Sequence, residues 1–428
     1  MKQIGESATL VPYRILLAAV LFVLFGPFAV AIPRNGIELK PTLILISIDG
    51  FRADYLAKYN PPNLRSLARE GVRARWMTPS YPTLTFPNHY TIATGLYPPR
   101  HGIVGNDIYD PTTGTSFSMG EPEAVHDARW WGGEPIWVTA EKQGQRTGAY
   151  FFPGTETEIG GVRPTYWKPY DGKVPNFERV DTALSWLDLP PAQRPTFITF
   201  YFSDVDHAGH EASPDSEDVA RAVATVDTAI GRLIDGLKAR GIYEQVNIII
   251  VSDHGMATVN PLHVTLLDNY FDVKRAGRIV WGAQLTQIFP KAGEEKTIYR
   301  ALKGGRLGHV RCYLKQEIPA RFRYRDSGRI GAIICMADEG WRIMSRQRFE
   351  DDRRKGKIPD HAIGAHGYDN RLASMRATFI ARGPAFKRGV VVAPFPNVDV
   401  YNIMARILRL KPAPNEGSQR AARSALAK

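Results

Sequence analysis

Three runs of apolar, largely β-branched residues place the strongest constraint on how this chain folds, because each run ends at a carboxylate. The runs and the acidic residues that follow them are TLILISI (42–48) with Asp49, TFITFYF (196–202) with Asp204 and Asp206, and VNIIIVS (246–252) with Asp253. Continuous apolar runs of this kind are typical of strands buried on both faces, as in a parallel sheet covered by helices. The sequence therefore predicts an α/β fold with a mostly parallel central sheet and helices on both faces.

A helix is predicted between the second and third runs. Ser213 offers a cap, Pro214 suits a first helical turn and Gly241 ends the pattern. The apolar residues that repeat at helical spacing between them are Val219, Val223, Val226, Ile230, Leu233 and Leu237. Strand, helix and strand in this order indicate a βαβ unit, in which ligands gather beyond the carboxyl ends of the strands. We therefore expect the acidic residues to converge at one edge of the sheet.

The length of 428 residues suits one large α/β unit with an insertion, or two domains. From about residue 260 to residue 360, short strand-like pieces alternate with basic and polar stretches, which predicts a smaller strand-rich insertion. The expected division is a signal peptide at 1–31, a catalytic core at 32–259 and 361–411, the insertion at 260–360, and a tail at 412–428. The tail is small, polar and basic, and is expected to be disordered.

The N-terminal segment has the features of an export signal. Lys2 and Arg14 precede an uncharged stretch from 15 to 32, and Ala29-Val30-Ala31 has the form of a cleavage site. The unbroken apolar part is shorter than the roughly 20 residues that a spanning helix needs. We therefore predict an exported, periplasmic or secreted protein, cleaved after Ala31, with no membrane span afterwards. An uncleaved anchor is the alternative.

Charge and cysteine content limit the other classes of function. The net charge of +12 comes from scattered Lys and Arg residues, which indicates a solvated surface with some attraction for anionic substrates. No basic arm or RNA-binding signature is present, so a nucleic-acid-binding module is not predicted. The two cysteines, Cys312 and Cys335, exclude a thiolate zinc framework and can either pair or lie buried as small apolar side chains.

Histidine and aspartate occur together in three short segments, DHAGH, DHG and AHGYD. With the first strand's aspartate, the candidate ligands are Asp49, Asp206, His210, Asp253, His254 and His366. Three carboxylates and three imidazoles without a thiolate suit two divalent metal ions, with zinc first and manganese or iron as alternatives. Each residue alone also has an ordinary structural interpretation as a helix cap, a turn residue or a loop histidine. Their joint position at the ends of consecutive strands favours the metal site.

Thr85 lies in SYPTLTFPNH, just before a short helix predicted to run from Pro87 to Gly95. The hydroxyl can cap this helix or act as a nucleophile. A helix N-terminus favours a bound phosphate, and a threonine hydroxyl becomes a nucleophile when a metal ion lowers its pKa. Given the predicted metal site, the nucleophile is the stronger interpretation, while Ser80 and Thr83 are expected to be loop residues.

These motifs resemble those of the nucleotide pyrophosphatase/phosphodiesterase family of the alkaline phosphatase superfamily. The matching segments run in the family's order over roughly residues 40 to 390, and include ISIDGFRADY, PTLTFPNHYTIATGLYPPRHGIVGN, PGTETEI, YFSDVDHAGH, SDHGM and GAHGYDN. One departure is Ser203-Asp204-Val205, which stands where the family commonly has an acidic pair. The resemblance is to a stand-alone catalytic domain, as in bacterial members.

The resemblance implies roles for individual residues. It assigns Asp49, Thr85, Asp253 and His254 to one Zn²⁺ and Asp206, His210 and His366 to a second Zn²⁺. It implies that Thr85 forms a covalent nucleotidyl intermediate. Asn106 corresponds to the side chain that stabilises the phosphoryl oxygen, together with the Phe86 N–H. Phe86, Tyr170 and Tyr201 correspond to aromatic residues around the nucleotide base, although Tyr201 in its apolar strand also suits the core.

The expected function is hydrolysis of nucleotide phosphodiesters and pyrophosphates, a small-molecule substrate class, to nucleoside 5′-monophosphates. The same chemistry on lysophospholipid or choline-phosphate diesters is an alternative, and a catalytically silent metal-containing binding protein is a second one. Sulfatase activity is disfavoured, because no C-x-P-x-R or S-x-P-x-R motif occupies the nucleophile position. The sequence determines neither the preferred substrate nor the oligomeric state.

Overall fold

The structure of the protein is a computed structural model that describes residues 39–304 and 307–427. The predicted signal peptide therefore lies outside the described residues. Among the residues described, no helix has the length and apolar character needed to cross a membrane.

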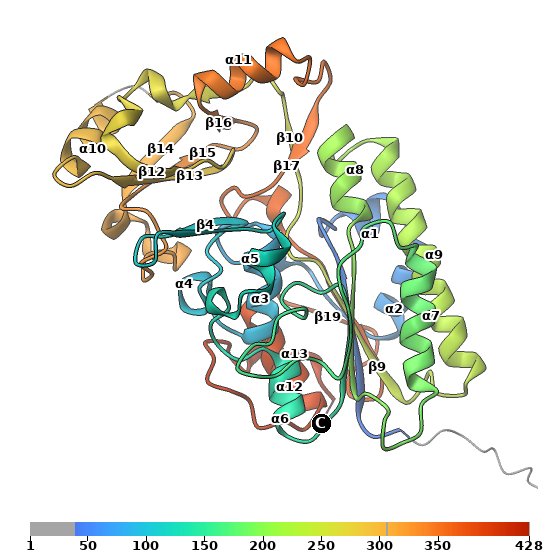
Figure 1. Cartoon of the computed structure of the whole chain (residues 1–428). Coiled ribbons are helices and arrows are strands. Elements are labelled where there is room, and N and C mark those ends of the chain that lie inside the picture. The colour runs from blue at the N-terminus through green and yellow to red at the C-terminus, as the bar shows by residue number, and fades with distance from the viewer. Residues whose placement is uncertain (1–38, 305–306, 428) are drawn as a thin grey trace, which may run out of the picture. The chain divides into compact units, whose positions relative to one another are not determined.

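An eight-stranded sheet forms the centre of the fold (Figure 1). In spatial order its strands are β19 (Val390–Val392), β2 (Val72–Ala74), β18 (Phe379–Arg382), β9 (Val246–Val251), β1 (Thr42–Ile48), β8 (Phe197–Phe202), β6 (Thr147–Tyr150) and β7 (Tyr166–Lys168). Strand β18 runs antiparallel to both β9 and β2, whereas the other neighbouring pairs are parallel. The predicted mostly parallel sheet is confirmed.

Both faces of the sheet are covered, which explains why its strands are apolar without interruption. In β1, Leu43 and Leu45 point into one hydrophobic core and Ile44 and Ile46 into the other. The helices on the Ile44 side are α2 (Pro62–Glu70), α7 (Asn176–Leu187) and α9 (Glu217–Ala239), and those on the Leu43 side are α3 (Thr85–Thr94), α6 (Ile136–Lys142) and α12 (Val400–Ile407) (Figure 1). Alternate side chains of a strand face opposite sides of a sheet, so each run serves two cores.

The predicted βαβ unit is present, with a difference at the start of its helix. Helix α9 begins at Glu217, and its cap is Ser216, whose side chain accepts a hydrogen bond from the Val219 N–H. Ser213 instead ends the preceding helix α8 (Asp204–Ala212), with a positive φ of 72°. The predicted cap at Ser213 is therefore wrong, because the DHAGH segment itself forms a helix that extends to Ala212.

The segment predicted as an insertion carries a second sheet. Its strands, in spatial order, are β12 (Ala276–Val280), β13 (Leu285–Pro290), β15 (Ile333–Ala337) and β14 (Val310–Leu314). Cys312 and Cys335 are register partners on β14 and β15 and form a disulfide. The chain enters and leaves this part through β10 (Ala257–Val259) and β17 (Ile363–Ala365), which pair antiparallel as a two-stranded neck.

The expectation of a disordered tail is wrong for residues 412–427. Helix α13 (Arg420–Ala425) buries Ala421, Ala422 and Ala425 in the core. The polar residues before it are also bound, since Ser418 donates from both its N–H and its hydroxyl to the Asp399 carboxylate. Small alanine side chains let this helix approach the core closely, so the low apolar content of the tail does not prevent packing.

Candidate active site

The carboxyl ends of three adjacent strands bring the candidate carboxylates together. Asp49 follows β1, Asp253 follows β9, and Asp206 lies in the first turn of α8 behind β8. The Gly50 N–H donates to Asp253 Oδ1 at 3.2 Å. Gly50 has a φ of 65°, and a Cβ at this position would lie 3.0 Å from the Asp206 Cβ. The turn after β1 therefore requires glycine for the carboxylates to approach one another.

The first ligand group surrounds His254. Its Nε2 atom lies 3.4 Å from Asp49 Oδ1 and 2.9 Å from Asp253 Oδ2. The Thr85 hydroxyl oxygen lies 3.3 Å from the same Nε2 atom. On the other side of the ring, Nδ1 donates to the Gly255 carbonyl at 2.9 Å, which leaves Nε2 as the electron-pair donor that faces the carboxylates.

The second ligand group contains Asp206, His210 and His366. The Nε2 atoms of the two histidines lie 3.0 Å apart, and the carboxylate lies 3.5 Å from His210 Nε2 and 3.6 Å from His366 Nε2. His210 Nδ1 donates to the Gly364 carbonyl at 3.0 Å, and His366 Nδ1 donates to the Thr83 carbonyl at 2.8 Å. Both Nε2 atoms therefore face the carboxylate as electron-pair donors, the arrangement typical of metal-binding histidines.

The chemistry of this donor set fits divalent metal ions. Within the described residues, buried oxygens Asp49 Oδ1, Asp206 Oδ1 and Asp253 Oδ2 accept no hydrogen bond. Burial, followed by the charges of Asp253 and Asp206, raises the pKa of Asp49. Buried carboxylate oxygens without donors are costly, and cations placed among them remove that cost. Ligand atoms of Asp206, His210 and His366, and those of Asp49, Asp206 and His254, each lie within 4.8 Å of one another. Each of these two groups, which share Asp206, has ligand atoms close enough together to hold a divalent ion.

Thr85 is the first residue of α3 and is not its cap. The N-cap is Leu84, which makes no side-chain capping bond, and the Thr85 hydroxyl contacts His254 instead. The capping interpretation is therefore wrong. Thr85 is only 6% exposed, yet it lines a large cavity. Its hydroxyl lies between the first ligand group and the space where a substrate can enter.

Asn106 faces the N-terminus of α3. Its Oδ1 atom accepts a hydrogen bond from the Phe86 N–H at 3.0 Å. The Phe86 N–H is thus engaged with the amide oxygen rather than free for a phosphoryl oxygen. This bond fixes the orientation of the amide and leaves its Nδ2 atom as the donor. The structure therefore differs from the expectation that Asn106 and Phe86 donate side by side.

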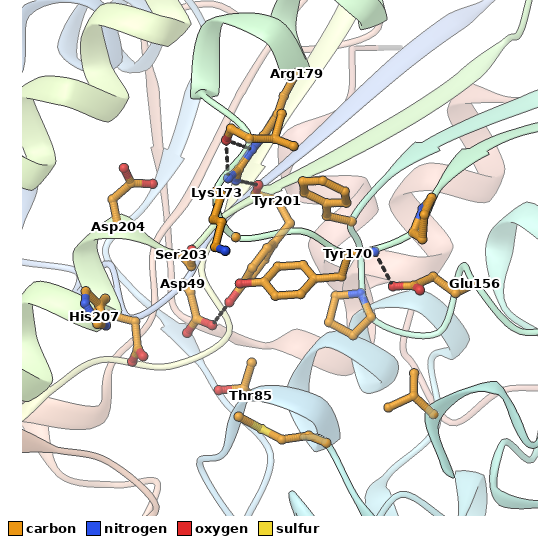
Figure 2. A pocket seen from close by; sticks show the side chains of 18 of the residues that line it. Asp49, Thr85, Glu156, Tyr170, Lys173, Arg179, Tyr201, Ser203, Asp204 and His207 are labelled. Carbon is orange, nitrogen blue, oxygen red and sulfur yellow. Dashed lines mark hydrogen bonds between the residues drawn. The ribbon is translucent and has the colours of Figure 1, made fainter. Parts of the chain in front are cut away.

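A cavity of about 1180 Å³ extends from Thr85 and holds the three candidate aromatic residues. Tyr170 is half exposed at its wall, and its ring centroid lies 6.2 Å from that of Tyr201. Tyr201 is buried in β8, and its hydroxyl donates to Asp49 (Figure 2). Phe86 lines the same cavity and packs on Phe117. Tyr201 thus belongs to both the core and the site, while Tyr170 and Phe86 offer ring faces to a flat ligand.

Three supporting residues were missed by the sequence analysis. Arg179, on α7, is buried and donates to the Tyr201 carbonyl and to the Val174 carbonyl, both at 2.8 Å (Figure 2). Glu156 accepts from the Tyr170 N–H at 3.0 Å. His89 donates from Nδ1 to the Thr85 carbonyl at 2.8 Å. Glu156 and His89 lie inside the PGTETEI and TFPNHYT segments, so their position in those motifs was the available signal.

Comparison with known proteins identifies the family. The family model for type I phosphodiesterase / nucleotide pyrophosphatase matches residues 43–369. The chain belongs to this family. It is 40% identical over 403 residues to an uncharacterized pyrophosphatase/phosphodiesterase of Schizosaccharomyces pombe, covering 90% of this chain and 80% of that protein. The family inferred from the motifs is confirmed.

Two further relatives extend the comparison. A venom phosphodiesterase of Crotalus durissus collilineatus is 40% identical over 394 residues, which cover 90% of this chain and 46% of that protein. The chain thus spans about half the length of the venom relatives that it matches. The structure of murine ectonucleotide pyrophosphatase / phosphodiesterase 5 superposes with a TM-score of 0.83 at 34% identity, covering 90% of this chain and all of that chain.

Proposed function

We propose that the protein hydrolyses nucleotide phosphodiesters and pyrophosphates to nucleoside 5′-monophosphates, with two Zn²⁺ ions and Thr85 as the nucleophile. The observation that carries this proposal is the position of the Thr85 hydroxyl, 3.3 Å from His254 Nε2 and on the wall of the large cavity. A related structure, an inactive threonine-to-alanine variant of the murine phosphodiesterase 5, is a complex with AMP. That complex supports both a threonine nucleophile and a nucleotide ligand.

Asp49, Asp253 and His254 would hold one Zn²⁺ with Thr85, and Asp206, His210 and His366 would hold the other. When bound, such ions polarise the phosphoryl oxygens and lower the pKa of a coordinated hydroxyl. The protein's own contribution is to hold the hydroxyl in place. The His89 imidazole binds the Thr85 carbonyl, and its Nε2 atom lies 2.7 Å from the Ser47 hydroxyl on β1. The nucleophile is thereby fixed to the central sheet.

In the first step, Thr85 Oγ bonds to the phosphorus, its proton goes to solvent, and the bond from phosphorus to the leaving oxygen breaks. In the second step, a water oxygen bonds to the phosphorus, the bond to Thr85 Oγ breaks, and a proton of the water returns to Thr85 Oγ, which restores the hydroxyl and releases the nucleoside monophosphate. The Asn106 Nδ2 group donates to a phosphoryl oxygen on which charge develops. One neutral donor suits a diester, which carries a single negative charge.

The nucleotide base would lie in the large cavity between Phe86 and Tyr170, with Tyr201 behind them. Stacking on aromatic rings accepts any base, because every base has a π face. Glu156 and Arg179 maintain this binding site: Glu156 holds the Tyr170 backbone, and Arg179 ties the Val174 carbonyl to the end of β8. The segment that carries Tyr170 is therefore held in place by hydrogen bonds at Tyr170 and Val174.

We also propose that the protein acts outside the cytoplasm, in the periplasm or after secretion. The Cys312–Cys335 disulfide supports this location, because structural disulfides persist in oxidising compartments. The similarity to a rat ectonucleotide pyrophosphatase/phosphodiesterase agrees with it. Mass spectrometry of the protein recovered from an exporting host tests both points: a chain that begins at Ile32 and lacks free thiols supports them, and a retained N-terminus with two free thiols contradicts them.

The decisive experiment replaces Thr85 with alanine and, as a matched control, with serine, which keeps a hydroxyl. Turnover of the p-nitrophenyl ester of thymidine monophosphate should vanish in Thr85→Ala and persist at a reduced rate in Thr85→Ser. Zinc content is measured in each protein, so that loss of metal is not mistaken for loss of the nucleophile. Substantial turnover by zinc-loaded Thr85→Ala would refute the nucleophile. Parallel kinetics on a phosphomonoester and on glycerophosphocholine test the substrate class.

A further inference from the structure

A second cavity, of about 370 Å³, shares Asn106 with the candidate active site and is not assigned to the nucleotide in the proposal above. Its walls come from the catalytic core and from the insertion. The residues that matter here are Leu84, Asn106, Asp107, Trp281, Gln284 and Arg342. A volume of this size is within the range of small-molecule sites.

This cavity borders the second ligand group rather than the nucleotide cavity. Gly367 follows His366, and a Cβ on it would lie 3.0 Å from Leu84 Cδ2 and 3.1 Å from the Gln284 Cβ. Two wall residues of the cavity therefore touch the residue next to a candidate ligand. Asn106, a third wall residue, is the group assigned to the phosphoryl oxygen.

The position of Thr85 determines which part of a substrate this cavity can receive. The hydroxyl contacts His254, which belongs to the first ligand group. In an in-line displacement the leaving oxygen lies opposite the nucleophile. In a site with two metal-ligand groups it therefore faces the ligand group that does not contact the nucleophile. Here the other group contains His366. The cavity that borders it therefore lies on the leaving-group side.

Arg342 distinguishes this cavity chemically. Its side chain is only partly exposed, and within residues 39–304 and 307–427 no carboxylate or carbonyl accepts a hydrogen bond from it and no ion pair includes it. Burial lowers the pKa of Arg342; Tyr368 and the charge of Asp352 have smaller effects that raise it, and the charge of Arg348 has a smaller effect that lowers it. By contrast, Arg348 at the cavity edge is paired with Asp352 at 3.4 Å. Asp352 therefore acts on Arg342 through its charge and not through a hydrogen bond, and a partly buried guanidinium without a hydrogen-bond acceptor favours binding of an anion.

The remaining walls are compatible with an anionic ligand that extends outward. Asp107 is the acidic residue of the wall, and its side chain is exposed, so its charge is screened by water. Trp281 is 37% exposed and presents an apolar ring face. A phosphate near Arg342, with a further group near Trp281, would satisfy the guanidinium and cover the ring.

We propose that this cavity is the leaving-group subsite, in which Arg342 binds a second phosphate of the substrate. The inference rests on the proposed function and deepens it: the enzyme would favour pyrophosphate bonds, whose leaving group is a phosphate or polyphosphate, over diesters with an uncharged leaving group. Arg342 is a specificity-determining residue in this scheme. Its contact is absent for the nucleoside monophosphate product, which occupies the other cavity.

The test compares ATP with the p-nitrophenyl ester of thymidine monophosphate. Both substrates transfer a nucleotidyl group, but they differ in the leaving group. In Arg342→Gln, kcat/KM for ATP should fall about ten-fold, the effect of one charge-assisted hydrogen bond. kcat/KM for the p-nitrophenyl ester should be unchanged. Arg311→Gln is the matched control, because Arg311 is an exposed arginine of the same subdomain that is paired with Asp338.

A binding measurement separates specificity from catalysis. Calorimetry on the zinc-loaded protein should show that Arg342→Gln weakens α,β-methylene-ATP about ten-fold and leaves AMP unchanged. Retained AMP affinity also shows that the variant is folded. Equal losses on both substrates, or unchanged ATP kinetics and α,β-methylene-ATP affinity, would overturn the subsite. A wild-type protein inactive on both substrates would overturn the proposed function itself.

Discussion

Asn106 provides a sharp test of how the site stabilises negative charge on the phosphoryl group. Of two substitutions at this position, the one that lowers activity more should lower folding stability less. Asn106→Ala removes both the Nδ2 donor and the Oδ1 acceptor of the Phe86 N–H. Asn106→Asp keeps an acceptor for that N–H, removes the donor, and adds a negative charge facing the phosphoryl group.

The expected magnitudes follow from these contacts. Loss of one donor aimed at a developing oxyanion costs about 3 to 4 kcal/mol, or about 10²- to 10³-fold in rate. In Asn106→Asp, two like charges about 4 Å apart add at most about 4 kcal/mol of repulsion at an effective dielectric constant of about 20. In Asn106→Ala, the Phe86 N–H loses its acceptor, which costs about 1 kcal/mol or more of folding stability.

The assay is kcat/KM on the p-nitrophenyl ester of thymidine monophosphate, with urea unfolding of the same zinc-loaded samples. Activity should decrease in the order wild type, Asn106→Ala, Asn106→Asp. Stability should be lowest for Asn106→Ala, and Asn106→Asp should be close to wild type. If Asn106→Asp is as active as Asn106→Ala, or if both retain nearly full activity, Nδ2 is not the donor to the phosphoryl oxygen.

Three further results are expected. Arg179→Met should raise KM for the nucleotide ester about ten-fold, because the segment that carries Tyr170 loses its hydrogen bonds to a buried guanidinium; an unchanged KM contradicts this. Burial lowers the pKa of His101 to about 3 in the folded protein, so the unfolded chain binds a proton at a higher pH than the folded chain does. The free energy of unfolding should therefore fall by about 1.4 kcal/mol per pH unit below about pH 6.5. His101→Gln should remove this part of the slope, measured by urea unfolding at pH 7 and pH 5. Replacing Cys312 and Cys335 with serine opens a loop closed across 23 residues and should cost about 3 kcal/mol, measured as a lower denaturation midpoint; equal midpoints contradict it.

The parts of the fold that were predictable from sequence are those that local patterns determine. The strands ending at Asp49 and Asp253 were evident because buried parallel strands are apolar without interruption. Their convergence followed from the βαβ rule, which needs no knowledge of side-chain packing. The candidate ligands could be named for the same reason, since all but His366 directly follow such strands or lie in the helix behind one.

The features that were not predictable depend on contacts between distant residues. The burial of Ala421 and Ala422 depends on the space that other helices leave for a small side chain, and composition does not show that space. Helix α9 is capped by Ser216 and not by Ser213, because Ser213 ends the preceding helix α8. The orientation of the Asn106 amide is set by the Phe86 N–H, across a separation of 20 residues. The cavity beside Arg342 exists only because the insertion packs against the core.

The two-stranded neck of β10 and β17 separates the candidate metal ligands from the insertion. Its paired residues Ala257 and Ala365 stand three residues after His254 and one residue before His366. The segment between these two points contains none of the candidate metal ligands. A change confined to the insertion, which supplies Arg342 and Trp281, would thus alter the proposed leaving-group subsite without replacing a candidate metal ligand.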